Sequence, residues 1–161
     1  MRIHNLYTDA SGQSHFRDIE VEWVEEGSAG KLSKRLPATG IIFRQVQPDY
    51  DLDWHPAPRR QYIINLDAGV QITAGDGEAR IIGAGEVVLV EDTTGKGHLS
   101  KAVEGKIRHC IVVPVELAGG SGEGKKRRAI RHSPVVFGGL RFSREGRSIP
   151  ARNGIAVPQI G

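Results

Sequence analysis

The sequence has little of what disulfide-bonded, zinc-finger and membrane-spanning proteins require. Cys110 is the only cysteine among the 161 residues, which excludes an intrachain disulfide and a cysteine-rich zinc site. No apolar run approaches the roughly eighteen residues of a membrane span, and the N-terminus carries no apolar segment of signal-peptide length. We therefore expect a soluble, cytoplasmic protein that does not enter a membrane, with Cys110 as a small buried hydrophobic residue.

Long helical patterns are also scarce. Glycine is abundant, with 21 residues, and the apolar residues fall in short clusters of valine and isoleucine. The stretch "DIEVEWV" (18–24) alternates apolar and acidic residues, as a half-buried strand does. Further strand candidates, joined by short connections rich in Gly, Asp or Pro, span 40–47, 60–67, 69–75, 78–83, 86–92, 97–103 and 106–115. Strands at such close spacing predict an all-β barrel or sandwich, and residues 27–36 are either a short helix or a loop.

The composition changes abruptly near residue 117. The following residues form a glycine-rich linker and then the basic run "KKRRAIRH", whereas residues 1–117 are mildly acidic and the whole chain has a net charge of +3. We expect one domain over 1–117 and a disordered basic tail over 118–161. The basic run could bind nucleic acid through charge alone, but no aromatic stacking platform or recognition helix accompanies it. We therefore do not expect a nucleic-acid partner.

Two stretches resemble the two sequence motifs of the cupin superfamily. In "HPAPRRQYIINLDAG", His55 stands at the first histidine of the first motif, Ala57 at the second, and Gln61 at the glutamate. In "GAGEVVLVEDTTGKGHLSK", His98 stands at the histidine of the second motif. The resemblance implies a single cupin jelly-roll barrel, or double-stranded β-helix, of the kind found in small stand-alone cupin proteins of uncharacterised activity. It does not imply one function, because cupins include dioxygenases, isomerases, sensors and storage proteins.

The resemblance also implies a metal at the mouth of the barrel. The full cupin pattern supplies three imidazoles and a carboxylate, whereas this chain has Ala57 and the neutral Gln61 at two of these positions. A set of His55, Gln61 and His98 with waters could hold Fe, Mn, Ni or Zn, but more weakly than the full pattern. Alternatively, His55 is bonded to a loop at the start of its strand, and Gln61 is a satisfied interior amide.

Paired arginines stand beside the expected barrel mouth. Arg59 and Arg60 follow a proline, and guanidinium groups suit a carboxylate or phosphate ligand through bidentate hydrogen bonds. The alternative is that they form salt bridges with the acidic segment 49–53. Glu91 and Asp92 precede the turn that leads to a histidine, so a carboxylate–histidine pair for proton transfer is conceivable.

Side chains alternate between the two faces of a strand, and this alternation bears on the roles of two further polar residues. If Gln61 points into the barrel, Asn65 shares its face, and a buried amide needs hydrogen-bond partners. Asn65 is then either a ligand contact or one half of a structural hydrogen bond. His109, on the last expected strand, is interpreted as a core histidine, with a replacement metal ligand as the alternative.

Two function hypotheses follow. The first is a binding module in which His55, Arg60, Gln61, Asn65 and His98 hold a small anionic molecule, with or without a weakly bound divalent metal. The alternative is a metal-dependent cupin enzyme, of dioxygenase or isomerase type, with His55, Gln61 and His98 as the metal ligands. In either case we expect a homodimer, formed by edge-strand pairing or by sheet packing.

Overall fold

The computed structural model describes residues 1–116, which form twelve strands and no helix. The expected tail, and the boundary near residue 117, lie outside the described residues. The all-β class is confirmed. The strands are β1 (Arg2–Thr8), β2 (Ser14–Glu20), β3 (Trp23–Gly27), β4 (Gly30–Ser33), β5 (Ile42–Val46), β6 (Asp51–His55), β7 (Gln61–Asn65), β8 (Val70–Thr73), β9 (Ala79–Ile82), β10 (Val87–Val90), β11 (His98–Ala102) and β12 (Arg108–Pro114).

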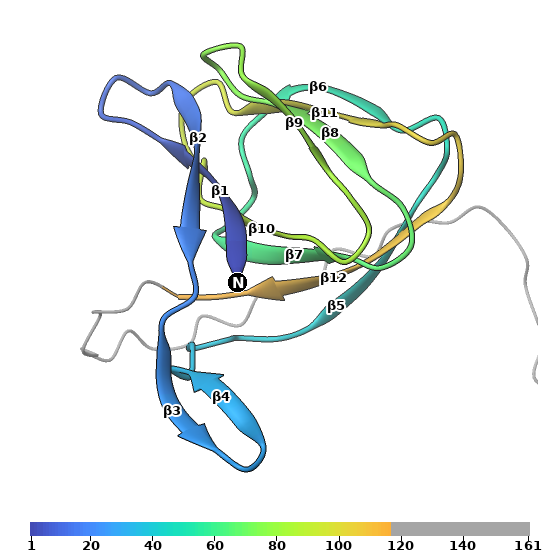
Figure 1. Ribbon diagram of the computed structural model, residues 1–161. Helices are drawn as coiled ribbons and strands as arrows, with labels where there is room; N and C mark the ends of the chain where they lie inside the picture. The colour runs from blue at the N-terminus through green and yellow to red at the C-terminus, as the bar shows by residue number, and fades with distance from the viewer. Residues whose placement is uncertain (117–161) are drawn as a thin grey trace, which may run out of the picture. The chain divides into compact units, whose positions relative to one another are not determined.

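Ten of the strands form two sheets that enclose one interior (Figure 1). The larger sheet has the order β2-β1-β10-β7-β12-β5, and the smaller has the order β6-β11-β8-β9. Within the larger sheet β1 pairs in parallel with β10, and the other pairs are antiparallel. This jelly-roll-like β fold agrees with the all-β barrel or sandwich that the strand spacing predicts. No stretch of residues 1–116 folds into a helix with the length and apolar character that a bilayer crossing requires.

Three strands were not predicted from the sequence. In β1 the apolar alternation is interrupted by two buried polar residues, His4 and Asn5. The Asn5 side chain donates to the carbonyl of Leu89 (3.1 Å) and to Glu91 (2.8 Å), so the fold itself satisfies the amide. Strand β6 has the sequence DLDWH, whose charges suit its place at the edge of the smaller sheet. The third strand, β4, belongs to a hairpin where the sequence suggested a short helix or a loop.

That hairpin, β3 and β4, forms a separate two-stranded sheet beside the larger one (Figure 1). Its register joins Trp23 to Ser33 and Gly27 to Gly30, and all of its residues are exposed. The strand predicted over 18–24 is thereby divided: its first part belongs to β2, and Trp23 begins β3.

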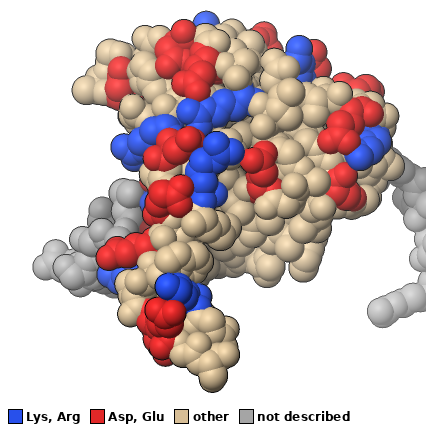
Figure 2. All heavy atoms as spheres, viewed as in Figure 1, with Lys and Arg blue, Asp and Glu red and all other residues tan. Residues whose placement is uncertain are grey.

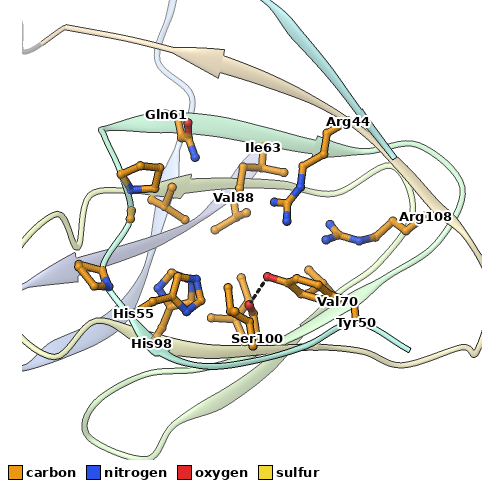
Figure 3. Close-up of a pocket in the computed structure, with 16 residues that line it drawn as sticks. Arg44, Tyr50, His55, Gln61, Ile63, Val70, Val88, His98, Ser100 and Arg108 are labelled. Carbon is orange, nitrogen blue, oxygen red and sulfur yellow. Dashed lines mark hydrogen bonds between the residues drawn. The ribbon is translucent and has the colours of Figure 1, made fainter. Parts of the chain in front are cut away.

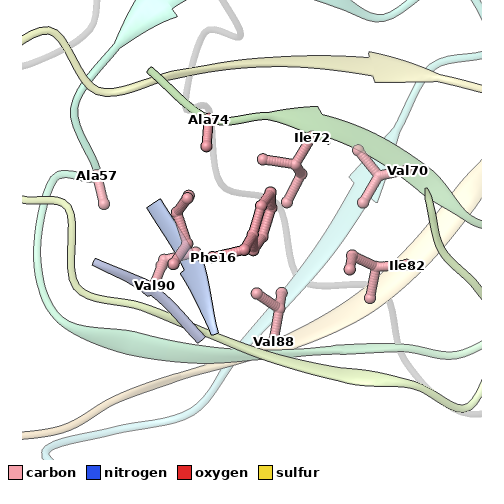
Figure 4. Close-up of a cluster of buried hydrophobic side chains, with 9 residues drawn as sticks. Phe16, Ala57, Val70, Ile72, Ala74, Ile82, Val88 and Val90 are labelled. Atoms are coloured by element: carbon pink, nitrogen blue, oxygen red, sulfur yellow. The ribbon is translucent and has the colours of Figure 1, made fainter. Parts of the chain in front are cut away.

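The core lies between the two large sheets. A cluster of buried apolar side chains, shown in Figure 4, consists of Leu6, Phe16, Ala57, Val70, Ile72, Ala74, Ile82, Val88 and Val90. The parity predicted for β7 is confirmed, because Gln61 and Asn65 are buried on the inner face whereas Tyr62 and Ile64 pack into a second apolar cluster. Cys110 is buried as predicted.

Candidate functional site

A cavity of about 420 Å³ lies between the two sheets, a volume in the range of small-molecule sites. Its walls are mostly apolar, and several core residues, including Val70 and Val88, form part of them. Polar side chains reach it from both sheets (Figure 3). They are Arg44, Tyr50, His55, Gln61, His98, Ser100 and Arg108.

The two motif histidines meet at one end of the cavity. Strands β6 and β11 pair so that His55 lies directly opposite His98, with ring centroids 4.3 Å apart and ring planes tilted by 54°. The pairing depends on Gly97, whose φ of +76° is unfavourable for other residues and whose backbone lies against the carbonyl of His55. The local sequence thus brings together two histidines that are far apart in the chain.

Each imidazole is oriented by a hydrogen bond from Nδ1. In His98, Nδ1 donates to Oδ2 of the fully buried Asp92 (2.6 Å), because a carboxylate can only accept. In His55, Nδ1 donates to the backbone carbonyl of Asp53 (2.7 Å). The Nε2 atoms of His55 and His98 make no hydrogen bond to another residue within 1–116. The carboxylate–histidine pair considered from the sequence is present, and Asp92 rather than Glu91 is its acidic member.

The loop that carries Gly97 is fixed by the turns beside it. Ser14 Oγ donates to the carbonyl of Gly97 (2.6 Å) and accepts from the amide of Gly75 (2.7 Å). Next to it, His15 bridges Asp9 and Asp76, at 3.0 and 2.6 Å. Hydrogen bonds to these two carboxylates raise the pKa of His15 above its ordinary value. This network holds the start of β11, and with it His98, at the cavity.

Gln61 enters the cavity from the opposite sheet. It begins β7, is 8 % exposed, and points inward in Figure 3, on the wall facing His55 and His98. Its amide makes no hydrogen bond to another side chain or to the backbone of the described residues. It is therefore a free hydrogen-bonding group in the cavity rather than a satisfied interior amide.

Two arginines that the sequence analysis did not select occupy the other end of the cavity. Figure 3 shows the guanidinium groups of Arg44, from β5, and Arg108, from β12, pointing into it, with the Tyr50–Ser100 hydrogen bond (2.7 Å) between them and the histidines. Arg108 is 5 % exposed, and its burial lowers the pKa of its guanidinium from the ordinary value. Neither arginine forms a salt bridge with any acidic side chain in residues 1–116.

Asn65 supports this cationic end without lining the cavity. Its Oδ1 accepts a hydrogen bond from Arg108 Nη1 (2.7 Å), and its Nδ2 donates to the carbonyl of Ile82 (2.7 Å). Of the two alternatives for this residue, the structure has the structural hydrogen bond, so Asn65 is a positioning residue for Arg108.

Arg60 lies away from the cavity lining. It precedes the inward-facing Gln61 in the chain, and its Nε donates to Glu91 while Nη1 donates to the carbonyl of Glu116 (3.1 Å). Its salt bridge is therefore with Glu91 rather than with segment 49–53.

The interpretation of His109 as a core histidine is wrong: its side chain is half exposed and bonded to Asp67.

The donors at the histidine end do not fit a tight metal site. No group of three or more His, Cys, Asp or Glu side chains in residues 1–116 is arranged to hold a metal ion, whereas a first-row divalent ion needs three or four converging donors. Two imidazoles are present. The nearby carboxylate of Asp92 accepts a hydrogen bond from Nδ1 of His98 and does not line the cavity. The third expected ligand, Gln61, is a neutral amide on the facing wall. Metal binding by His55, Gln61 and His98 stays a prediction.

We expect elemental analysis of protein purified without a metal-affinity step to find well under one equivalent of Fe, Mn, Ni or Zn. We also expect Gln61→Glu to leave this amount unchanged, since the new carboxylate would lie across the cavity from the imidazoles. The matched control is His98→Ala, which removes one imidazole. One equivalent of metal in the wild type, lost in His98→Ala, would contradict the expectation and favour the metal-dependent alternative.

The fold and the cavity together define the class of the protein: a jelly-roll-like β fold with a ligand-sized interior that is cationic at one end and carries paired histidines at the other. No protein-family model and no curated protein matches the chain.

Several solved structures align with parts of the chain, among them the following three. Conserved protein SPY1581 of unknown function from Streptococcus pyogenes is 21% identical over 53% of this chain and 69% of its own (TM-score 0.39). Protein NMB1881 from Neisseria meningitidis is 16% identical over 55% of this chain and 91% of its own (TM-score 0.39). A putative ethanolamine utilization protein Q from Salmonella typhimurium LT2 is 12% identical over 72% of this chain and 98% of its own (TM-score 0.36). At these TM-scores the alignments carry no argument about function.

Proposed function

We propose that the barrel of this protein binds a small organic anion whose charged group is held by Arg44 and Arg108. The observation that carries the proposal is the pair of guanidinium groups at one end of the cavity, with no carboxylate partner for either within residues 1–116. Guanidinium groups bind carboxylates and phosphates through bidentate, charge-assisted hydrogen bonds.

The burial of Arg108 supports this proposal. A buried charge without an ionic partner is costly, because the interior does not replace the hydration of the ion. The single hydrogen bond from Arg108 to Asn65 orients the guanidinium but does not neutralise it. A bound anion supplies the missing charge, and the low dielectric of the cavity strengthens the attraction.

The opposite end of the cavity suits a polar, uncharged part of the same molecule. The two histidines present Nε2 atoms, and Gln61 offers one donor group and one acceptor. Apolar walls between the ends, including Ile63 and Val88, suit a short carbon skeleton. The ligand class is therefore a small carboxylate or phosphate with a hydrogen-bonding group at its other end.

A panel of small carboxylates and inorganic phosphate, each paired with its neutral amide or alcohol analogue, tests the proposal. We expect at least one anion to raise the thermal unfolding temperature in proportion to the logarithm of its concentration, since a ligand of the native state alone stabilises it. The neutral analogues should not do so. Equal effects of anions and analogues, or none from any compound, would contradict the proposal.

Membership of the cupin superfamily is part of the same proposal. It is supported by the two sequence motifs and by the jelly-roll-like fold, in which the motif histidines His55 and His98 pair. The alternative function, a metal-dependent cupin oxygenase or isomerase, is less well supported, because it needs a third strong metal ligand where this chain has Gln61.

A further inference from the structure

Two hydroxyl groups interrupt the apolar middle of the cavity. Tyr50 lies in the connection before β6, Ser100 lies on β11, and their hydroxyl oxygens are 2.7 Å apart. Ser100 is 4 % exposed, and both residues line the cavity. Figure 3 shows the pair between the arginines and the histidines, across the cavity from Ile63 and Val88 of the larger sheet. The two sides of the cavity therefore differ in polarity between its ends.

The backbone fixes this hydroxyl pair in place. The amide of Tyr50 donates to the carbonyl of Gln47 (3.2 Å), and the carbonyl of Tyr50 accepts from the amide of Ala102 (2.8 Å). Ser100 lies in the middle of β11, which pairs with β6 on one side and β8 on the other. Both hydroxyl groups are thus held at the cavity before a ligand binds, so that little ordering is needed on binding.

The pair leaves one O–H donor without a partner. Each hydroxyl group has one hydrogen and two lone pairs. Their mutual hydrogen bond uses one of the two hydrogens, whether Tyr50 or Ser100 donates it. Neither hydroxyl group makes another hydrogen bond within residues 1–116. The remaining O–H is therefore available to an oxygen atom of a bound molecule, and a molecule that covers it without accepting loses affinity.

We propose that the bound anion carries a hydroxyl or carbonyl oxygen between its charged group and its far end, and that Tyr50 and Ser100 select this oxygen. The inference rests on the proposed anion site, because the arginines fix which end of the molecule lies near Tyr50. Cζ of Arg44 is 5.5 Å from the centroid of the Tyr50 ring, so the hydroxyl pair is next to the charged end. The ligand class narrows to hydroxy acids, oxo acids and phosphate esters of polyols.

Three separate contacts make the cavity selective for one enantiomer of a hydroxylated ligand. The arginine pair holds the charged group, the histidine end holds the far group, and the hydroxyl pair reaches only an oxygen that points towards it. In the opposite enantiomer, bound the same way, this oxygen points at Ile63 and Val88, which offer no hydrogen bond. Burying a hydroxyl group without a partner costs free energy, so the apolar wall disfavours that enantiomer.

Basic side chains on the outside of the domain do not provide such selectivity. Figure 2 shows Lys and Arg interspersed with Asp and Glu on the visible face. Arg80, for example, forms salt bridges with Asp18 and Glu78. An anion that binds weakly at an exposed arginine contacts it through the charged group alone, so its two enantiomers bind equally. A difference between enantiomers therefore reports on the cavity.

Titration calorimetry with the full chain compares glycerate with 3-hydroxypropionate, and glycerol phosphate with the monophosphate of 1,3-propanediol. The members of each pair share the charged group and the terminal hydroxyl group, and only the first carries an oxygen between them. We expect one enantiomer of glycerate or of glycerol phosphate to bind about 10-fold more tightly than its mirror image and than its reference compound, the effect of one hydrogen bond. The two pairs distinguish a carboxylate from a phosphate.

The double substitution Tyr50→Phe and Ser100→Ala removes both hydroxyl groups, whereas either single substitution leaves one O–H in place. We expect it to reduce both affinity ratios, between enantiomers and against the reference compound, to about one. The matched control is Tyr62→Phe, which removes a tyrosine hydroxyl group from the outer face of β7, and both ratios should persist there. Thermal unfolding verifies that each variant folds.

The possible outcomes separate this inference from the proposed anion site. Equal affinities of enantiomers and reference compounds in the wild type, with binding that is lost in Arg44→Gln, would overturn the inference and leave the anion site standing. Ratios that persist in the double variant would also overturn it. If none of the compounds binds, both the inference and the proposed anion site are wrong.

Discussion

Arg44→Gln should weaken binding of the anionic ligand by about 10- to 100-fold, the loss expected when a charge-assisted hydrogen bond is removed. Arg108→Gln should have an effect at least as large, because Arg108 is the buried member of the pair. Arg44 lies at the exposed side of the cavity and makes no salt bridge within residues 1–116, so its loss should not unfold the protein. Titration calorimetry with the most stabilising anion of the panel measures both affinities.

Arg60→Gln provides the matched control. Arg60 precedes Gln61 and is the arginine that the sequence motif suggested, but its guanidinium pairs with Glu91 outside the cavity. The substitution removes the same charge from the protein as Arg44→Gln does, so a general electrostatic effect would appear equally in both variants. We expect the Arg60→Gln affinity to stay within about twofold of wild type. A loss in Arg60→Gln that matched the loss in Arg44→Gln would assign anion binding to the sequence motif instead.

Most of the fold could be predicted because its strands carry local signals. The alternation in β7 correctly indicated which residues face the interior, and the glycine-rich connections correctly indicated turns. The strands that were missed depend on distant partners. Strand β1 holds His4 and Asn5 in its buried middle, and Asn5 is accommodated because Leu89 and Glu91 accept hydrogen bonds from its Nδ2 while Arg17 donates one to its Oδ1. The residues next to Asn5 in the sequence give no indication of a contact with residues so far along the chain.

The candidate site could be predicted only in part, because some of its residues carry a local sequence signal and others are brought together only by the fold. The motifs indicated His55 and His98, which the strand pairing of β6 and β11 places side by side in the cavity lining. Arg108 carried a usable signal, because it shares its strand face with Cys110, which was expected to be buried. That parity also places His109 outside, where it bonds to Asp67. Arg44 carried no such signal: its strand is exposed along most of its length, and only the folded barrel brings it opposite the histidines.

Gly97→Ala should be among the most destabilising single substitutions in the described domain. A Cβ at this position would lie closer than 3.0 Å to backbone atoms of His55 and Pro56, and backbone cannot move aside as a flexible side chain can. The φ of +76° adds a second penalty, since residues with a Cβ rarely adopt it. To relieve the contact, the turn before β11 must separate from the end of β6. We expect a loss of about 3 kcal/mol or more in the free energy of unfolding, measured by urea denaturation.

Gly77→Ala separates the two causes. Gly77 also has a positive φ, +93°, but an added Cβ would meet no atom within 4 Å, so only the backbone penalty of about 1 kcal/mol applies. The difference between the two variants then measures the close approach of the turn to His55. Because His98 follows Gly97 directly, Gly97→Ala should also weaken anion binding, whereas Gly77→Ala should not. Equal losses of stability in the two variants would mean that the turn before His98 can shift freely, and that the histidine pair is not held by this contact.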